Sequence, residues 1–290
     1  FVTGVQTCAL PICRIAGVRY RTAAGEEGEI HAELTVGCDG RTSILREAAG
    51  LVPREFPVPF DTWWFRVPRH EEGGEVSGLS PRIKGNEFLL MINRGDYFQI
   101  AYFLKKGSDP LLRAEGIERF RERIVTLAPE LADRVDAISS MDEVKVLDVR
   151  LNRLRRWHTD GLLLIGDAAH AMSPIGGVGI NVAVQDAVAT ATLLADPLRR
   201  HRIRPSDLAR VRRRRWFPTA LTQGLQRAMQ QLIVGPVLEG RQTTFPKGPQ
   251  WLMTKFPALR AIPAYVVAIG PRPEHAPSVQ IGRASCRERV

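Results

Sequence analysis

The sequence predicts an α/β fold in which strands end in ligand-binding loops, and three observations lead to this prediction. An apolar strand pattern over residues 162–165 breaks at a glycine-rich loop and continues as a helical pattern from Ile180. A second apolar strand pattern, residues 34–38, also ends at a turn that precedes a helix signal. Between them, residues 60–104 carry the aromatic and β-branched residues that are typical of a sheet.

Composition and charge restrict the classes of protein. The 290 residues are 44% hydrophobic, which is enough for a large core in one or two domains. The net charge of +10 comes from arginines spread along the chain, with one cluster at 212–215, and this predicts a solvated helix face and no nucleic-acid binding. The sequence has no continuous apolar run of 18 residues, so we expect no membrane span and a cytoplasmic protein, with the oligomeric state left open.

The four cysteines have no metal-ligand spacing, so no metal site is expected. Cys38, at the end of a strand pattern, is expected to be a small buried apolar residue.

The first candidate site follows residues 34–38. Asp39 could accept a hydrogen bond from a sugar hydroxyl, and Gly40 permits a tight turn. Ser43 and Arg46 would open the next helix, with Arg46 available for a pyrophosphate. The alternative is an Asp-Gly turn that is followed by a helix cap and binds nothing.

The middle of the chain is expected to be rich in strands. Strands are predicted over 60–67, 87–92 and 97–104, followed by a helix over 114–127 and a strand over 144–151. Their aromatic residues could line a substrate pocket, although core packing is favoured for each of them. These are Trp63, Trp64, Phe65, Tyr97, Phe98, Tyr102 and Phe103.

The second candidate site is the loop between residues 165 and 180. Asp167 lies where a strand ends, which is where open α/β sheets bind ligands, and it could accept bonds from sugar hydroxyls. Gly176, Gly177 and Gly179 would let the backbone approach a flat ligand and expose amides at a helix N-terminus, where the helix dipole stabilises negative charge. His170 is expected to hydrogen-bond within the loop and not to act as an acid or base. The alternative is a glycine-rich turn without a ligand.

Both segments resemble motifs of FAD-dependent monooxygenases related to p-hydroxybenzoate hydroxylase, the group A flavoprotein hydroxylases. The pattern GDAAHxxxPxxGxGxN is matched by Gly166, Asp167, Ala168, Ala169, His170, Pro174, Gly177, Gly179 and Asn181. The pattern DGxxSxxR is matched by Asp39, Gly40, Ser43 and Arg46. The resemblance implies that Asp167 binds the ribityl chain of FAD. It also implies that the loop from Pro174 to Asn181, with Gly176, Val178 and Ile180, lies against the isoalloxazine ring. The shorter motif would touch the adenosine side.

The resemblance also implies a function. NADH or NADPH would reduce FAD, and dioxygen would then form a flavin hydroperoxide that hydroxylates an aromatic or other small hydrophobic substrate. No catalytic side chain is assigned. Two alternatives remain: a flavoprotein that does not oxygenate, such as a halogenase, dehydrogenase or prenyl reductase, and an inactive fragment.

The ends of the chain differ from this pattern. The sequence contains no GxGxxG motif, which holds the dinucleotide pyrophosphate in related folds. The stretches FVTGVQTCALPIC and IGRASCRERV look like translated sequencing adapters. We therefore expect artefactual tails at 1–13 and 281–290, a lost N-terminal region and weak or no retention of FAD. The alternative is a pair of ordinary disordered termini.

The predicted organisation is an incomplete glutathione-reductase-type FAD-binding domain of Rossmann-like fold with an inserted domain. Residues 14–53 and 153–200 would form the FAD-binding domain, 54–152 the sheet-rich substrate domain, and 201–280 a C-terminal helical region. A long helix from Ile180 is expected to be buried against the sheet, with Asp186 paired to backbone or an arginine. Residues 206–234 are expected to form one or two amphipathic helices that serve as a packed layer, a lid or a dimer surface, the packed layer being favoured.

Overall fold

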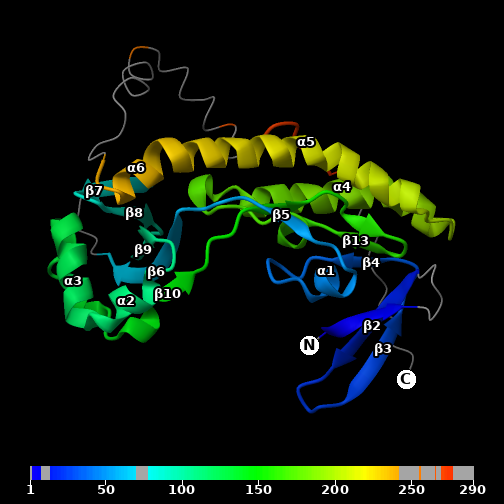
Figure 1. The fold of residues 1–290 in the computed structure, drawn as a ribbon, viewed down its shortest axis with the longest axis horizontal. Helices are drawn as coiled ribbons and strands as arrows, with labels where there is room; N and C mark the ends of the chain where they lie inside the picture. Colours follow the sequence, from blue (N-terminus) through cyan, green and yellow to red (C-terminus); the bar gives the residue numbers. More distant parts are fainter. Residues whose placement is uncertain are drawn as a thin grey trace.

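The computed structural model describes residues 2–7, 14–69, 78–241, 255, 265 and 269–276. These residues form a mixed fold of helices and strands, as the sequence predicts. Two long helices, α4 (Gly179–Arg199) and α5 (Pro205–Met229), run along one side of the molecule (Figure 1). Helix α5 extends from above the small sheets near the N-terminus to α6 (Gly235–Leu238) beside a larger sheet at the opposite end, and α4 lies along part of its length.

The N-terminal sheet consists of β1 (Val2–Thr7), β2 (Ile15–Arg21) and β3 (Glu27–His31) in antiparallel pairing. Part of the stretch that we interpreted as a tail is therefore a strand, and its adapter origin stays a prediction. Residues 8–13 and 277–290 lie outside the described residues.

A parallel strand pair connects the two sequence motifs. In a sheet of order β12-β13-β4, β13 (Leu162–Leu164) is parallel to β4 (Thr35–Gly37) and antiparallel to β12 (His158–Thr159). Gly37 fits opposite Leu164 because an added Cβ would come within 2.5 Å of the leucine side chain. Cys38 is exposed and not buried as expected, because β4 ends at Gly37 and Cys38 belongs to the turn that follows the strand.

The larger sheet has the order β10-β6-β9-β8-β7. Its strands are β6 (Phe60–Pro68), β7 (Leu79–Lys84), β8 (Glu87–Asn93), β9 (Tyr97–Lys105) and β10 (Lys145–Leu147). The predicted strand over 144–151 is wrong in length, because the Asp61 carboxylate accepts a hydrogen bond from Val149 N at 3.0 Å and diverts the chain. The chain continues as β11 (Asn152–Leu154), which pairs with β5 (Pro53–Glu55).

Helices and short turns complete the fold. The helices are α1 (Ile44–Ala48), α2 (Asp109–Ala114), α3 (Gly116–Leu127) and α6 (Gly235–Leu238). Turns of 3-10 helix occur at Pro129–Leu131, Val135–Ala137, Met141–Glu143, Gly166–Ala168 and Ile175–Gly177. A π-helical segment, Gln230–Val234, joins α5 to α6, so the predicted helical stretch 206–234 is one long helix that changes its winding near the end.

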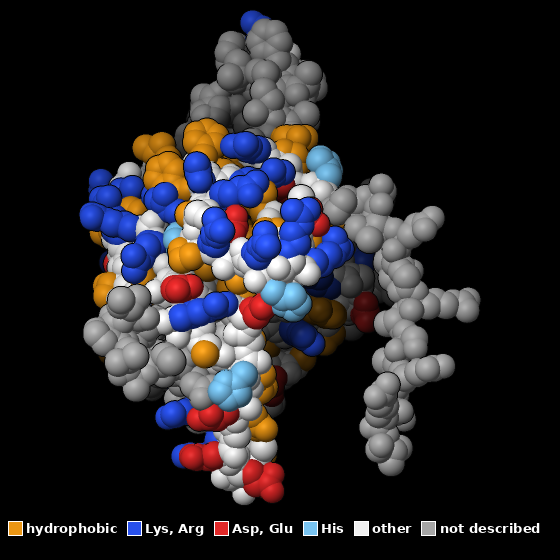
Figure 2. All heavy atoms as spheres, turned by 90° about the vertical axis from the view of Figure 1, so that its right-hand side faces the viewer, with side chains coloured by type: hydrophobic (Ala, Val, Ile, Leu, Met, Phe, Trp, Pro, Cys, Tyr) orange, Lys and Arg blue, Asp and Glu red, His pale blue; other side chains and the backbone are white. Residues whose placement is uncertain are grey.

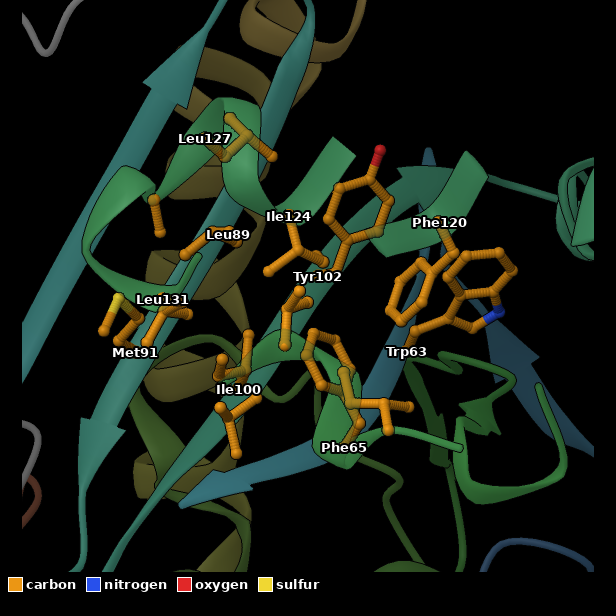
Figure 3. Packing of buried hydrophobic residues seen from close by; sticks show 14 of the residues in the cluster. Trp63, Phe65, Leu89, Met91, Ile100, Tyr102, Phe120, Ile124, Leu127 and Leu131 are labelled. Atoms are coloured by element: carbon orange, nitrogen blue, oxygen red, sulfur yellow. The ribbon is translucent and has the colours of Figure 1, made fainter. Parts of the chain in front are cut away.

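The aromatic residues of the large sheet pack on both of its faces. Figure 3 shows Trp63, Phe65 and Tyr102 pointing toward Phe120 and Ile124 of α3. The opposite face carries Phe60, Phe88 and Phe103, which cluster with Ile175 of the motif loop and with α6. Core packing, the favoured alternative, is thus the role of these buried aromatics, because alternate residues of a strand point to opposite faces.

Helix α4 is long and apolar, and it packs mainly against α5 and the 3-10 turn Gly166–Ala168. In the described part of the chain, the helical stretch 175–199 is long and apolar enough to cross a membrane by length and composition, a test that core helices also pass. Asp186 of this helix is fully buried and ion-paired to Arg215 of α5. The predicted arginine partner of Asp186 is confirmed, whereas the predicted burial of the whole helix is wrong, because Ile180 and Val184 are exposed and only one side of the helix is buried.

Candidate functional site

The two sequence motifs meet at the carboxyl edge of the parallel pair. Ile165 N donates a hydrogen bond to Gly37 O at 3.0 Å, which continues the pairing to the point where both strands end. From the other motif, the Arg46 guanidinium donates to Ala168 O at 3.0 Å. Asp39 and Asp167, 128 positions apart in the numbering, therefore follow neighbouring strand ends at one edge of the sheet.

Asp39 caps helix α1. One carboxylate oxygen accepts from Ser43 Oγ at 2.6 Å and the other from Leu45 N at 3.1 Å. Ser43 is the N-cap, as predicted, and its hydroxyl accepts from Arg46 N at 3.0 Å. This is the geometry of the ligand-free alternative, but an ionised carboxylate has about four acceptor positions. Because Asp39 is exposed, it can accept a further hydrogen bond from a ligand.

Asp167 lacks such partners. It is half-buried in the 3-10 turn after β13, and among the described residues no hydrogen bond reaches its carboxylate. Burial raises the pKa of Asp167, while the positive charges of His170 and Arg41 act in the opposite direction. A partly desolvated carboxylate without a donor is costly, so this group is suited to accept hydrogen bonds from a hydroxylated ligand.

A buried ion-pair network lies beneath this turn. One Asp186 oxygen accepts from Gly166 N at 3.1 Å and lies 2.5 Å from His170 Nε2, and the other accepts from Arg215 Nε at 3.0 Å. Burial alone would raise the pKa of Asp186, but the bonds to His170 and Arg215 outweigh it and lower the pKa. The network fixes Gly166, whose φ is 57°, directly before Asp167. The side chain of His170 bonds a residue of α4 and not its own loop, whereas its backbone N donates to Gly166 O at 2.9 Å within the loop.

Two glutamines of α5 hold the motif loop by its backbone. Gln226 Nε2 donates to Ser173 O at 2.8 Å and to Ile175 O at 2.9 Å, and Gln226 Oε1 accepts from Ser173 N at 3.2 Å. Gln223 Nε2 donates to Asn152 O at 2.7 Å and Ala171 O at 3.0 Å. Both side chains are buried, so these bonds replace the regular pairing that an irregular loop lacks.

The end of the loop exposes backbone. Gly176 and Gly177 are exposed with φ of 79° and 64°, and a Cβ added to Gly177 would meet nothing within 4 Å. Helix α4 starts at Gly179 without a side-chain cap. The first amides of this long helix have no side-chain cap, so they are available to an electron-rich group. The open space over the glycine backbone allows a flat group to approach closely.

The predicted site residues divide into two groups. Asp39, Gly40, Asp167, Gly176, Gly177, Gly179, Ile180 and Asn181 are exposed or half-buried, whereas Arg46, Gly166, Ala168, His170 and Val178 are buried. Pro174 is half-buried. The buried group shapes the loop, and the first group borders its outer surface. Their contacts with a cofactor remain a prediction.

Sequence reasoning missed the residues of α5 that support the loop. Gln223 and Gln226 lie in the expected amphipathic helix, but the solvated face predicted for the arginine cluster 212–215 is wrong for Arg215, which is fully buried against Asp186. The pattern could have been found, because glutamines at 223, 226 and 230 recur at helical spacing and form one polar stripe, which is buried.

Known proteins resemble this chain in sequence and in fold. The family model described as an FAD binding domain matches residues 14–223. Over 245 residues the chain is 34% identical to 6-methylpretetramide 4-monooxygenase of Streptomyces rimosus, covering 80% of this chain and 55% of that protein. It is 33% identical over 191 residues to kynurenine 3-monooxygenase of Xanthomonas oryzae pv. oryzae (strain PXO99A). This match covers 60% of this chain and 40% of that protein. The chain thus spans about half the length of these curated relatives.

Among solved structures, the fold is similar to that of pqsL, a probable FAD-dependent monooxygenase from Pseudomonas aeruginosa. The TM-score is 0.64 at 20% identity, covering 83% of this chain and 65% of that one.

Proposed function

The chain belongs to the FAD binding domain family, and from this premise we propose that it acts in an NAD(P)H-dependent monooxygenase. Its substrate is an aromatic or other small hydrophobic molecule, which is hydroxylated with oxygen from dioxygen. The proposal draws on the family match and on relatives that are named as monooxygenases.

The observation that carries the proposal is the unpartnered carboxylate of Asp167 beside Asp39 at one sheet edge. FAD fits this edge chemically, because its ribityl chain and its ribose present hydroxyl donors. Asp167 would accept from the ribityl hydroxyls and Asp39 from the ribose. The open space over Gly177 leaves room for the flat ring.

Bound FAD supplies the electron transfer and the oxygen chemistry, and the residues of this chain bind and orient it. Amides at the start of α4, near Gly179, stabilise negative charge on the ring. The buried pair of Asp186 and Arg215 holds the turn that presents Asp167.

The substrate would lie on the face of the large sheet that meets the motif loop. Ile175 of the loop is buried there with Phe60 and Phe103 in the core, so the substrate would meet Trp64 and Leu90, which are only partly buried beside them. An apolar surface next to the ring position suits a hydrophobic substrate and excludes water.

Titration of the chain with FAD tests the cofactor. We expect weak, saturable quenching of flavin fluorescence, and about tenfold weaker binding for Asp167→Ala because a charged acceptor is lost. Asp160→Ala, at the turn before β13, is the control and should bind FAD like the parent chain. Equal affinity of parent and Asp167→Ala would contradict the proposed site.

The reaction class needs a second measurement. With FAD, NADH or NADPH and an aromatic substrate in air, a monooxygenase consumes oxygen and adds one oxygen atom to the product, which mass spectrometry detects. Oxidation of NAD(P)H without oxygen incorporation would favour the non-oxygenating alternatives.

A further inference from the structure

Four arginines from three elements surround two aromatic rings on the side of the motif loop that α5 covers. The guanidinium carbons of Arg54, Arg153 and Arg227 lie 5.3, 5.7 and 4.9 Å from the centre of the Phe56 ring. Those of Arg153 and Arg212 lie 5.0 and 5.9 Å from the Trp216 ring. Elements β5, β11 and α5 therefore place three guanidinium groups around Phe56 and two around Trp216, with Arg153 common to both rings.

These charges are not neutralised within the described part of the chain. None of the four arginines forms an ion pair with a carboxylate among the residues that the structure describes; Arg153 donates to the neutral Gln223 at 3.2 Å. Burial lowers the pKa of Arg153, and the charges of Arg54, Arg212 and Arg227 lower it further. The Nε of Arg212 is buried without a hydrogen-bond partner.

Other arginines of the same helix are paired with carboxylates. Arg214 bonds the carboxylate of Glu274 at 2.6 Å, and Arg215 pairs with Asp186. Arg153 is thus repelled by the three other arginines, and no carboxylate among the described residues compensates this charge, a cost that a bound anion would relieve.

We propose that Arg54, Arg153, Arg212 and Arg227 form a binding site for a phosphorylated small molecule. Guanidinium groups bind phosphate oxygens in a two-pronged geometry, and a phosphate or pyrophosphate brings more than one negative charge. A single carboxylate would leave most of the positive charge unbalanced. Phe56 and Trp216 support the guanidinium planes and keep them near one another.

The site is separate from the edge that carries Asp39 and Asp167. Strand β11 lies between them: Asn152 N donates to Ala171 O at 3.2 Å and Leu154 N to Ala169 O at 2.8 Å. The arginine site is thus next to the backbone of the motif loop, while its side chains belong to β5, β11 and α5. Its existence does not depend on FAD, so the two proposals can fail independently.

Calorimetric titration of the chain with inorganic pyrophosphate, without flavin, tests the site. We expect saturable binding that weakens as salt is raised, and a 10- to 100-fold loss of affinity in Arg153→Gln/Arg227→Gln. Arg153→Lys keeps the positive charge but loses the planar guanidinium group. Its affinity for pyrophosphate should therefore lie between those of the parent and the double variant.

Arg213→Gln is the matched control. Arg213 is an exposed arginine of α5 next to Arg212. Figure 2 shows that many Lys and Arg side chains gather on one face of the molecule, so an exposed arginine is a fair control for charge alone. Its replacement removes the same charge from the same helix and should leave pyrophosphate affinity within twofold.

Three outcomes would overturn the proposal: no saturable binding of pyrophosphate, an unchanged affinity in the double variant, or an equal loss in Arg213→Gln. If the double variant fails to unfold cooperatively in urea, Arg54→Gln, at an exposed position, replaces it and should still weaken binding about tenfold. Titration with 2′,5′-ADP identifies the source of the phosphate. Tighter binding than that of pyrophosphate assigns the site to a nucleotide, and weaker binding assigns it to a free phosphate compound.

Discussion

Two regions of the molecule are stabilised by different interactions. We call the large sheet with α3 the apolar end, and the motif loop with α4 and α5 the polar end. The large sheet and α3 share a core of apolar side chains, among them Leu89, Ile100 and Ile124, all fully buried. Around the motif loop, buried polar residues from α4 and α5 bond to backbone and to each other. Apolar packing tolerates small shifts, whereas hydrogen bonds fix atoms in direction as well as distance. The polar end is therefore the one that can present a carboxylate and a run of amides in a defined geometry.

The largest loss of stability is expected from removing the carboxylate at the centre of the buried polar network. Asp186→Ala leaves Arg215 and His170 buried without their shared carboxylate, and we expect a loss of about 3–5 kcal/mol in the free energy of unfolding. Urea denaturation measures it. Asp196→Ala in the same helix removes an exposed partner of Arg199 and should cost less than about 1 kcal/mol. Similar losses in both variants would show that the buried network does not stabilise this end.

The apolar end should respond to lost volume. Leu89→Ala removes a fully buried side chain from the sheet core and should cost about 2–4 kcal/mol, again measured in urea. Leu111→Ala is the control, because Leu111 of α2 is 72% exposed, and it should change stability by less than about 0.5 kcal/mol. We also expect Leu89→Ala to leave the FAD affinity of the folded protein unchanged. A weaker affinity would show that the two ends are coupled.

The sequence predicted the apolar end from periodicity. Alternation placed strands at 60–67, 87–92 and 97–104 within a few residues of β6, β8 and β9, because each strand has one face toward α3 and one toward the motif loop. The strand over 144–151 was overestimated, because Asp61 bonds Val149 across 88 positions and local pattern cannot contain that contact.

At the polar end the sequence predicted positions better than contacts. The motifs placed Asp39 and Asp167 at strand ends, and the parallel register brings those ends together. The partner of His170, the supporting glutamines of α5 and the cap role of Asp39 depend on tertiary contacts between distant segments. The exposure of Cys38 also differs from the prediction, because the surroundings of a strand end cannot be deduced from the residues of that strand alone.

A matched pair of glycines separates binding from stability. Gly177 in the motif loop and Gly85 between β7 and β8 have φ of 64° and 61°, and an added Cβ meets nothing within 4 Å at either position. Alanine is strained at such a φ, so each of the two variants should lose about 1 kcal/mol in the free energy of unfolding. Only Gly177→Ala should also weaken FAD binding, by about tenfold or more, because the methyl group occupies the space above the loop. Equal FAD affinity in the two variants would remove Gly177 from the proposed site.

The smallest effects are expected from two aspartates with opposite pKa shifts. Burial raises the pKa of Asp167, whereas hydrogen bonds from Lys106 and Arg150 lower that of Asp148 to about 2. A raised pKa means that the folded state resists ionisation, so stability falls as pH rises through the folded pKa of Asp167. Asp167→Asn should therefore raise the urea midpoint slightly at pH 7 and leave it unchanged below the usual aspartate range, while FAD binding weakens by at most the tenfold expected for Asp167→Ala.

Asp148→Asn should behave in the opposite way. Its contribution is present at neutral pH and disappears as pH falls from the usual aspartate range toward 2, so the variant should be less stable than the parent at pH 7 by up to about 1 kcal/mol. The difference should vanish in acid. If Asp167→Asn instead destabilised the protein at pH 7, its carboxylate would already have a partner within the fold, and it would no longer be the free acceptor on which cofactor binding depends.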